Sequence, residues 1–278
     1  MELLTKELLA PLFPKRKPDD NKYSVGTALA IVGSKYMTGA AVLAAKGALY
    51  TGTGLLYLAS EKDALPILQA HLLEPVFCES DIGSVKKRLW RTNAVLFGCG
   101  VEMSEHNFGL LEYILEMKEL PTVLDASALT MLSQRKELYG KLSKNTVLTP
   151  HEAEMARLMG ETPAYVSQNR EKAASEFLER YGCTLVLKGQ GTLIASEGRL
   201  YRNPTGNTGM AKGGYGDLLS GMILALLSRG VLPEHAAMLG VYLHGLCGDI
   251  TAQRVGEDSA LPSLAAESIG EAIKKLRT

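Results

Sequence analysis

Three glycines and an aspartate lie together in the segment Asn203–Arg229, which reads NPTGNTGMAKGGYGDLLSGMILALLSR. Its first half is polar and glycine-rich and its second half is almost continuously apolar, so we expect a loop that leads into a buried helix. Gly213, Gly214 and Gly216 at the junction let backbone N–H groups crowd together, and a helix start adds positive potential. This pattern indicates an anion site. Asp217 follows as either a helix N-cap or a catalytic base.

Three other segments carry side chains that could act on a ligand. Lys188 ends an apolar run in LKGQGT, where it is either a solvated strand end or a contact to a nucleotide phosphate or sugar. In TPHEAEM, a capping role is the strong alternative for Glu154, whereas His151 has no obvious packing task. Asp125 either caps the next helix or takes part in metal or phosphate chemistry.

The loop GSKYMTGA also invites comparison with nucleotide-binding loops. Gly33 and Gly39 are six residues apart and no Lys-Ser/Thr pair follows, so the loop is not a Walker A motif, and it is not GxGxxG. It is either a turn that requires glycine or a ligand contact through the backbone of Thr38, Gly39 and Ala40.

Alternating apolar strands and helices predict how these residues are positioned. The alternation indicates a mostly parallel sheet, in which ligands bind beyond the carboxyl ends of the strands. We therefore expect Asp125, His151 and Lys188 to share one edge of the sheet. The expected strands are 27–32, 55–60, 94–97, 122–124, 146–148 and 184–187, with a hairpin at the sheet edge from 192–196 and 199–203. The expected helices are 41–50, 108–117, 152–159, 170–181, 235–254 and 264–276, after an N-terminal helix and a surface arm within 1–23.

Composition limits the class of protein. The 278 residues contain no linker that would separate domains, so we expect one α/β domain over 1–278. The formal net charge is zero, which argues against nucleic-acid or membrane-surface binding through bulk basicity. Four scattered cysteines, no secretory segment and no apolar run of about 20 residues predict a soluble cytoplasmic protein with reduced thiols and no membrane partner.

A glycine-rich anion site, a lysine and several acids on one rim favour phosphoryl transfer, which needs charge stabilisation, a magnesium ion and a base at the acceptor hydroxyl. In these motifs the chain resembles the ADP- or ATP-dependent NAD(P)H-hydrate dehydratases, within the ribokinase-like superfamily. The resemblance covers nearly the whole chain. Its most specific parts are GSKYMTGAAVLAAKGAL, TPHEAEMARL, LKGQGT and NPTGNTGMAKGGYGD.

The resemblance implies a three-layer α/β/α sandwich with a mostly parallel central sheet. It also implies repair of NADH or NADPH whose nicotinamide ring is hydrated (the S epimer), coupled to hydrolysis of ADP or ATP. The ring hydroxyl is phosphorylated, and phosphate then leaves to regenerate the double bond. Further implications are Mg²⁺, a homotetramer, and an NAD(P)H-hydrate epimerase on a separate chain as functional partner.

Site residues carry over position by position. Asp217 matches the catalytic aspartate, and Gly214, Tyr215 and Gly216 match the anion hole. The segment Lys188, Gly189, Gln190, Gly191 and Thr192, together with Gly216, matches the nucleotide site. Ala40, Gly100 and His151, with Asp217, match positions that line the hydrated dinucleotide. Glu154 resembles the acid that organises magnesium through water.

The chain departs from the family pattern at two places. Tyr215 stands where threonine is usual between the last two glycines; its side chain can point away while its backbone N–H still serves. In LDASAL, Ser127 replaces an acid, so Asp125 alone remains as a candidate there.

Two other functions are compatible with these residues. One is a small-molecule kinase of the same superfamily acting on a vitamin precursor, which would accumulate a phosphorylated product. The other is a non-catalytic nucleotide-binding protein of the same fold. Retention of Asp217 and the glycines argues against the second.

Overall fold

The strand expected near residue 30 is β2 (Thr27–Ile31), and all of its residues are buried. Successive side chains of a strand point to opposite faces. Accordingly, Ala28 and Ala30 join one hydrophobic core, and Leu29 and Ile31 join a second. Since both faces of the strand are apolar, both need a covering layer, and the sequence of β2 already dictates a sheet between two layers of helices.

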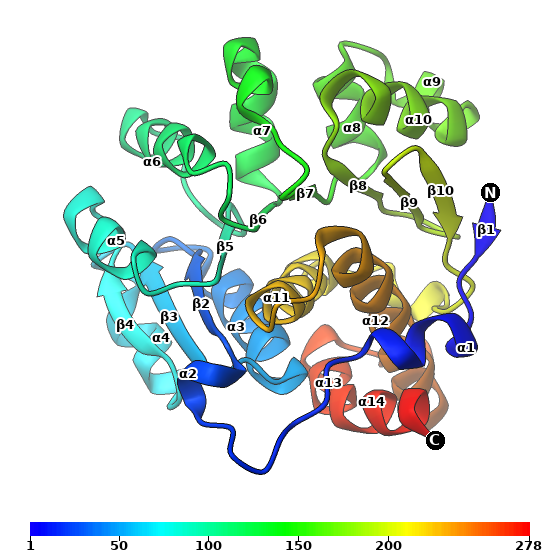
Figure 1. Cartoon of the computed structure of the whole chain (residues 1–278), viewed down its shortest axis with the longest axis horizontal. Helices are drawn as coiled ribbons and strands as arrows, with labels where there is room; N and C mark the ends of the chain where they lie inside the picture. The colour runs from blue at the N-terminus through cyan, green and yellow to red at the C-terminus, as the bar shows by residue number, and fades with distance from the viewer.

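The computed structural model describes residues 1–278 and contains one ten-stranded sheet of order β1-β10-β9-β8-β7-β6-β5-β2-β3-β4 (Figure 1). Neighbouring strands are parallel except β8 with β9 and β9 with β10, which are antiparallel. Besides β2, the strands are β1 (Glu2–Leu3), β3 (Leu55–Ser60), β4 (Val76–Glu79), β5 (Ala94–Phe97), β6 (Thr122–Leu124), β7 (Thr146–Leu148), β8 (Thr184–Leu187), β9 (Leu193–Ser196) and β10 (Arg199–Arg202).

Helices cover both faces of the sheet. The first core is closed by α1 (Lys6–Leu9), α3 (Thr38–Thr51), α4 (Leu65–His71), α11 (Tyr215–Ser228), α12 (Pro233–Val255), α13 (Pro262–Glu267) and α14 (Ile269–Arg277). The second core is closed by α5 (Ile82–Leu89), α6 (Glu105–Glu116), α7 (Ser127–Gln134), α8 (Glu152–Met159), α9 (Pro163–Gln168) and α10 (Arg170–Tyr181). A short α2 (Lys22–Val25) precedes β2.

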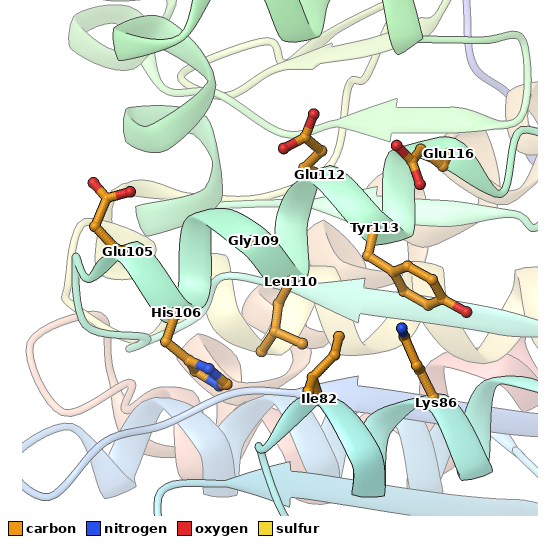
Figure 2. A pocket seen from close by; sticks show the side chains of 9 residues that line it. All are labelled: Ile82, Lys86, Glu105, His106, Gly109, Leu110, Glu112, Tyr113 and Glu116. Atoms are coloured by element: carbon orange, nitrogen blue, oxygen red, sulfur yellow. The ribbon is translucent and has the colours of Figure 1, made fainter.

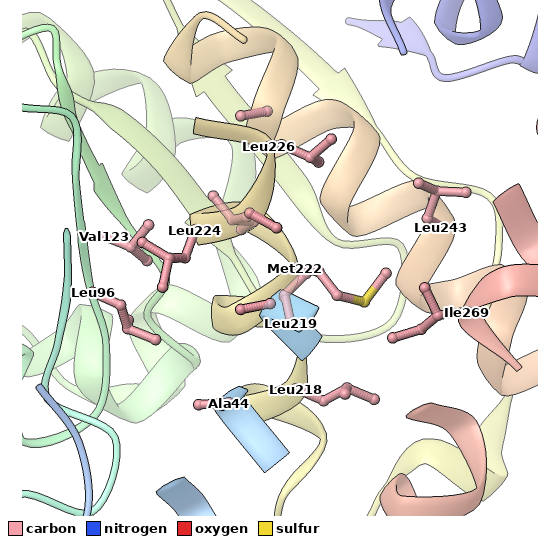
Figure 3. Close-up of a cluster of buried hydrophobic side chains, with 14 of the residues drawn as sticks. Ala44, Leu96, Val123, Leu218, Leu219, Met222, Leu224, Leu226, Leu243 and Ile269 are labelled. Atoms are coloured by element: carbon pink, nitrogen blue, oxygen red, sulfur yellow. The ribbon is translucent and has the colours of Figure 1, made fainter. Parts of the chain in front are cut away.

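Helix α11 is the centre of the first core, and its apolar side chains meet the sheet on one side and α12 and α14 on the other (Figure 3). A helix that is apolar all round must be buried, as this one is. Glycines let it approach α3 closely: a Cβ at Gly221 would lie 1.9 Å from the Ala44 carbonyl oxygen, and one at Gly47 would lie 2.3 Å from the Leu218 oxygen. This packing holds α11 directly against α3.

Most expected strands and helices are confirmed, with ends that shift by a few residues, and four differences stand out. The hairpin β9–β10 does not form the edge, because β1 pairs outside it in parallel with β10. The helix expected over 264–276 is divided into α13 and α14, and the N-terminal helix is only one turn followed by a 3₁₀ turn. The segment 61–93, left unassigned from the sequence, forms α4, β4 and α5.

Candidate active site

A cavity of about 1070 Å³ lies over the carboxyl ends of β6, β7 and β8, bounded by the loop Asn203–Gly214 and by α12. Most residues singled out from the sequence line it: Asp125, His151, Glu154, Lys188, Gly189, Gln190, Gly191, Thr192, Gly214, Tyr215, Gly216 and Asp217. The expectation that strand-end residues share one edge is therefore confirmed. Ala40 and Gly100 are not among the lining residues.

Ala40 and Gly100 lie together beside this cavity. They follow the carboxyl ends of β2 and β5, the two neighbouring strands between which the order of the sheet reverses. Gly100 has a φ of +68°, and a Cβ there would lie 3.0 Å from the Cβ of Ala40. Such a reversal opens a crevice at the sheet edge. The two residues thus mark a second part of the rim, next to the buried Cys99.

Asp125 is buried at the end of β6 and carries a complete set of partners. Lys188 Nζ donates to its Oδ1 over 2.8 Å, and the Ser220 hydroxyl donates to its Oδ2 over 2.8 Å. Burial acts to raise the pKa of this carboxyl, but the ammonium of Lys188 and these hydrogen bonds hold the pKa below its usual value. The pKa of Lys188 is correspondingly raised by Asp125 and Glu154 despite desolvation. The pair is a buried ion pair.

The turn after Asp125 is strained. Ala126 has a φ of +51°, unusual for a residue with a side chain, and its N–H donates to Asp125 Oδ1. A Cβ at Gly98 would lie 2.0 Å from the Asp125 carbonyl oxygen, so only glycine fits there. The helix α7 has Ala126 as its N-cap residue, and the suggested capping role of Asp125 is wrong.

Asp217 lies in the first turn of α11, whose N-cap residue is Gly214 with a φ of +101°. The suggestion that Asp217 is the N-cap is therefore wrong, because the helix begins two residues earlier. Carboxylate oxygens of Asp217 and Asp125 and the sulfur of Cys99 lie within 4.8 Å of one another. Burial, with the negative charge of Asp125 adding to it, raises the pKa of Asp217 to about 6.

The residues Gly213–Gly216, which we call the glycine loop, bring the start of α11 against the Asp125–Lys188 ion pair. A Cβ at Gly216 would lie 3.2 Å from Lys188 Nζ and 3.8 Å from Asp125 Oδ2. The first N–H groups of a helix have no partner within it, so those at this end are available to an anion. The side chain of Tyr215 points away, as expected: it is buried, packs edge-on against His244, and donates its hydroxyl to the Ala260 oxygen.

His151 and Glu154 form a capping box at the start of α8. His151 Nδ1 accepts from the N–H groups of Ala153 and Glu154, and Glu154 Oε2 accepts from the His151 N–H over 2.8 Å. His151 therefore has a structural task that the sequence did not reveal. Glu154 Oε2 also lies 3.9 Å from Lys188 Nζ, which links α8 to the ion pair.

The segment Lys188–Thr192 folds as a turn in which only Gly189 and Gln190 are exposed. Its glycines have φ values of +139° (Gly189) and +60° (Gly191). Arg170 from α10 donates to the carbonyl oxygens of Leu187, Lys188 and Gln190 and so fixes the turn. The guanidinium of Arg202 covers Gly191, where a Cβ would lie 2.6 Å from Nε. The turn thus presents its backbone to the cavity.

Several residues of the site were not singled out from the sequence: Arg170, Arg202, Asn207, Lys212, Ser220 and His244. Ser220 and Cys99 contact Asp125 from segments far away in sequence. His244 Nε2 is buried without a hydrogen-bond partner, and burial lowers the pKa of this imidazole to about 4. Asn207 and Lys212 belong to the segment Asn203–Arg229, whereas none of the motifs points to Arg170, Arg202 or His244.

A smaller depression of about 440 Å³ lies between α5 and α6 (Figure 2). Ile82 and Lys86 line it from α5, and Glu105, Glu112 and Glu116 come from α6. These acids are paired with Arg135 and Lys141, and none of the expected site residues is present.

No helix in the structure combines the length and the apolar composition that a membrane crossing requires.

A family model described as NAD(P)H-hydrate dehydratase matches residues 28–271. The ADP-dependent (S)-NAD(P)H-hydrate dehydratase of Neisseria meningitidis is 38% identical over 270 residues, which cover 96% of this chain and 90% of that protein. Other similar proteins are bifunctional NAD(P)H-hydrate repair enzymes, of whose length the chain spans about half.

Solved structures of similar proteins point to the same family. The ADP/ATP-dependent NAD(P)H-hydrate dehydratase of Bacillus subtilis, co-crystallised with ATP/Mg²⁺, has a TM-score of 0.87 at 29% identity, covering 99% of this chain and 98% of that one. A ribokinase-like superfamily protein from Enterococcus faecalis has a TM-score of 0.89 at 26% identity, covering 100% of this chain and 97% of that one. The ribokinase-like α/β/α fold expected from the resemblance is confirmed. This chain belongs to the NAD(P)H-hydrate dehydratase family.

Proposed function

We propose that this protein dehydrates the S epimer of hydrated NADH or NADPH and couples the reaction to hydrolysis of ADP or ATP. One observation carries the proposal: Asp217, whose pKa is raised to about 6, adjoins both the glycine loop and the Asp125–Lys188 ion pair in the large cavity. A carboxylate with such a pKa is matched to proton transfer near neutral pH. Family membership supports the reaction class.

In this proposal Asp217 accepts the proton of the ring hydroxyl as the hydroxyl oxygen attacks the terminal phosphorus of the nucleotide. The bond from that phosphorus to the remaining nucleotide breaks, which leaves AMP from ADP or ADP from ATP. Negative charge on the transferred group meets the N–H groups of Gly214, Tyr215 and Gly216 at the start of α11. The bond from the ring carbon to the phosphorylated oxygen then breaks, and phosphate leaves because it is a better leaving group than hydroxide. The adjacent ring carbon loses a proton to solvent, and the ring double bond is restored.

The nucleotide occupies the turn Lys188–Thr192 together with Gly216. Its exposed backbone, braced by Arg170, supports close approach of a ligand. The hydrated dinucleotide lies across Ala40, Gly100 and His151, which brings its ring hydroxyl toward Asp217. The crevice between β2 and β5 supports this orientation of the dinucleotide, because the crevice adjoins Cys99 and the Asp125–Lys188 ion pair.

Magnesium fits beside Glu154. Mg²⁺ keeps several waters and binds through one or two carboxylates plus substrate phosphates. Both oxygens of Asp125 are already engaged by protein donors, whereas Glu154 faces the cavity with one oxygen that has no protein partner. Glu154 would hold the ion through water, and the ion would neutralise phosphate charge during transfer.

The proposal has three broader parts. Residues 1–278 act as a single domain, with one site that combines the large cavity with the crevice at Ala40 and Gly100. The protein works with an NAD(P)H-hydrate epimerase on a separate chain, which supplies the S epimer. It forms a homotetramer.

The test is incubation of the protein with hydrated NADH and Mg²⁺, and with ADP and ATP in separate arms. Recovery of reduced-nicotinamide absorbance with stoichiometric release of phosphate is the expected result. A phosphorylated product that persists would instead identify a kinase, and the absence of both would refute phosphoryl transfer to this substrate. Omission of Mg²⁺ tests the ion, and gel filtration with light scattering tests the tetramer.

A further inference from the structure

The loop Asn203–Gly214 packs against one face of α12. His244, Gly245, Gly248 and Asp249 recur at spacings that bring them to the same side of a helix. A Cβ at Gly245 would lie 2.6 Å from the Thr205 carbonyl carbon, and one at Gly248 would lie 2.2 Å from the sulfur of Met210. The loop therefore rests directly on the helix, with no room for a side chain between them.

Asp249 makes the polar half of this contact. Its Oδ2 accepts from the Gly206 N–H over 3.0 Å, and its Oδ1 accepts from the Asn207 side-chain amide over 2.8 Å. Asn207 Oδ1 accepts in turn from the Gly209 N–H over 3.0 Å. No basic side chain forms an ion pair with Asp249, so these two donors are its only protein partners. Hydrogen bonds to an ionised acceptor are among the stronger ones in proteins.

The far end of the loop is held from the segment that follows α12. Lys212 Nζ donates to the Gly209 and Glu257 carbonyl oxygens over 2.8 Å each, and the Thr208 hydroxyl is hydrogen-bonded to the Glu257 carboxylate. Two residues after Lys212, Gly214 begins the turn into α11. The position of the glycine loop is thus set from α12, although no residue of α12 is a predicted site residue.

We propose that Asp249 is a positioning residue, which holds Gly206 and Asn207 and thereby fixes the N–H groups of Gly214–Gly216 relative to Asp217. This rests on the proposed function, since it assigns Asp249 a part in the same reaction. Gly206 and Asn207 line the large cavity, whereas Asp249 itself does not. Misplacing a catalytic group by about 1 Å can lower the rate roughly 10²-fold.

The chain offers a reciprocal test through Asp249→Asn and Asn207→Asp. The first variant leaves one acceptor oxygen for two donors, and the second sets two carboxylates against each other. The double variant restores all three bonds: the new amide at 249 donates to the carboxylate at 207 and accepts from the Gly206 N–H, while the second oxygen at 207 accepts from the Gly209 N–H.

We expect each single variant to lower kcat roughly 10- to 100-fold, with little change in the KM of the nucleotide, and the double variant to recover to within about threefold of the parent protein. Hydrogen exchange of the amides of 206–216 should accelerate in both single variants and slow again in the double variant. Glu267→Gln, which removes one charge from an exposed position of α13, is the matched control for the charge change.

A backbone variant checks the same idea without altering charge. Gly245→Ala pushes against the Thr205 backbone and should lower kcat as Asp249→Asn does. Gly270→Ala on α14, where a Cβ meets nothing within 4 Å, should not. Normal kcat and normal exchange in Asp249→Asn would overturn the proposal, as would a double variant no better than its worse parent.

The exchange measurement does not depend on the substrate. If the parent protein fails to restore reduced nicotinamide, the proposed function fails. The hold of Asp249 on the loop is then still decided by exchange in the reciprocal pair.

Discussion

The carboxyl end of β6 and the first turn of α11 each contribute one aspartate to the same buried cluster, yet the two carboxylates differ in character. Asp125 has the Lys188 ammonium at 2.8 Å and a serine hydroxyl, and its pKa stays below the usual value. Asp217 is less buried than Asp125 and has no ion-pair partner of its own, yet its pKa rises to about 6. Partners rather than burial decide which carboxylate is a permanent anion and which can exchange a proton.

The largest effect should come from Asp217→Asn, which removes the exchangeable member of the pair. Because the amide cannot accept the hydroxyl proton, we expect turnover of hydrated NADH to fall roughly 10²- to 10⁴-fold while nucleotide still binds. Turnover is measured by nicotinamide absorbance and binding by calorimetry. Asp63→Asn, at an exposed position, is the control. Near-normal turnover in Asp217→Asn would contradict its role as the base.

Lys188→Met removes the partner that distinguishes Asp125. A buried carboxylate left without its counter-charge is costly, so we expect the free energy of unfolding in urea to drop by about 3–5 kcal/mol. Adding Asp125→Asn should return much of this loss, because the double variant has no unpaired charge. Lys172→Met on the exposed face of α10 is the matched control. A double variant as unstable as the sum of the single variants would show that the two groups are not coupled.

The pH dependence should follow Asp217 alone. Since the ionised form is required, kcat should rise with pH, reach half of its plateau near pH 6 and level off about one pH unit higher. A flat profile between pH 5 and 8, measured at saturating nucleotide, would contradict this assignment.

The free energy of unfolding should change with pH in the opposite direction to kcat. The folded protein holds the Asp217 proton more tightly than the unfolded chain, so the stability that protonation contributes is lost as pH rises from the ordinary carboxyl pKa of 3.8 to about 6. Asp217→Asn removes this penalty and should stabilise the protein by roughly 1–3 kcal/mol at pH 8. The gain should shrink as pH approaches 4. Urea unfolding of both proteins at several pH values measures it, and a gain independent of pH would refute the linkage.

The smallest effect should come from Tyr215→Phe, which tests the neighbour of Asp217 that faces away from the cluster. Loss of the hydroxyl bond to Ala260 should cost about 0.5–1.5 kcal/mol of stability. The backbone N–H that the anion site needs is unchanged, so kcat should stay within about twofold, because the side chain only packs. Thermal unfolding and turnover measure the two effects. A tenfold loss of kcat would mean that the hydroxyl reaches the ligand.

The sequence predicted the parts of the fold that depend on local pattern. Buried strands such as β2 and β5 and the apolar helix α11 follow from short apolar runs bounded by glycine. The segment 61–93 went unassigned because α5 is mostly polar and β4 is partly exposed, so neither presents a simple periodic pattern. The position of β1 outside the hairpin depends on a contact between residues about 200 apart.

For the candidate site, too, the sequence predicted which segments come together but not the contacts between their side chains. Strand-end residues converge because parallel strands share an edge, so Asp125, His151 and Lys188 could be grouped in advance. The contrast between Asp125 and Asp217 could not be predicted, because it depends on Ser220 and Lys188 reaching one carboxylate and not the other. The capping role of His151 and the contacts of Asp249 with the loop Asn203–Gly214 likewise need side-chain positions.

The pairing of β1 with β10 has a practical consequence. Leu3 lines the large cavity, on the same wall as Arg202 and the turn Lys188–Thr192. The other end of the chain lies on α14, where Arg277 donates to the Pro14 carbonyl oxygen on a different side of the molecule (Figure 1). Under the proposed function, an affinity tag fused before Met1 would lie near the mouth of the cavity and compete with the nucleotide, whereas one fused after Thr278 would leave the mouth open.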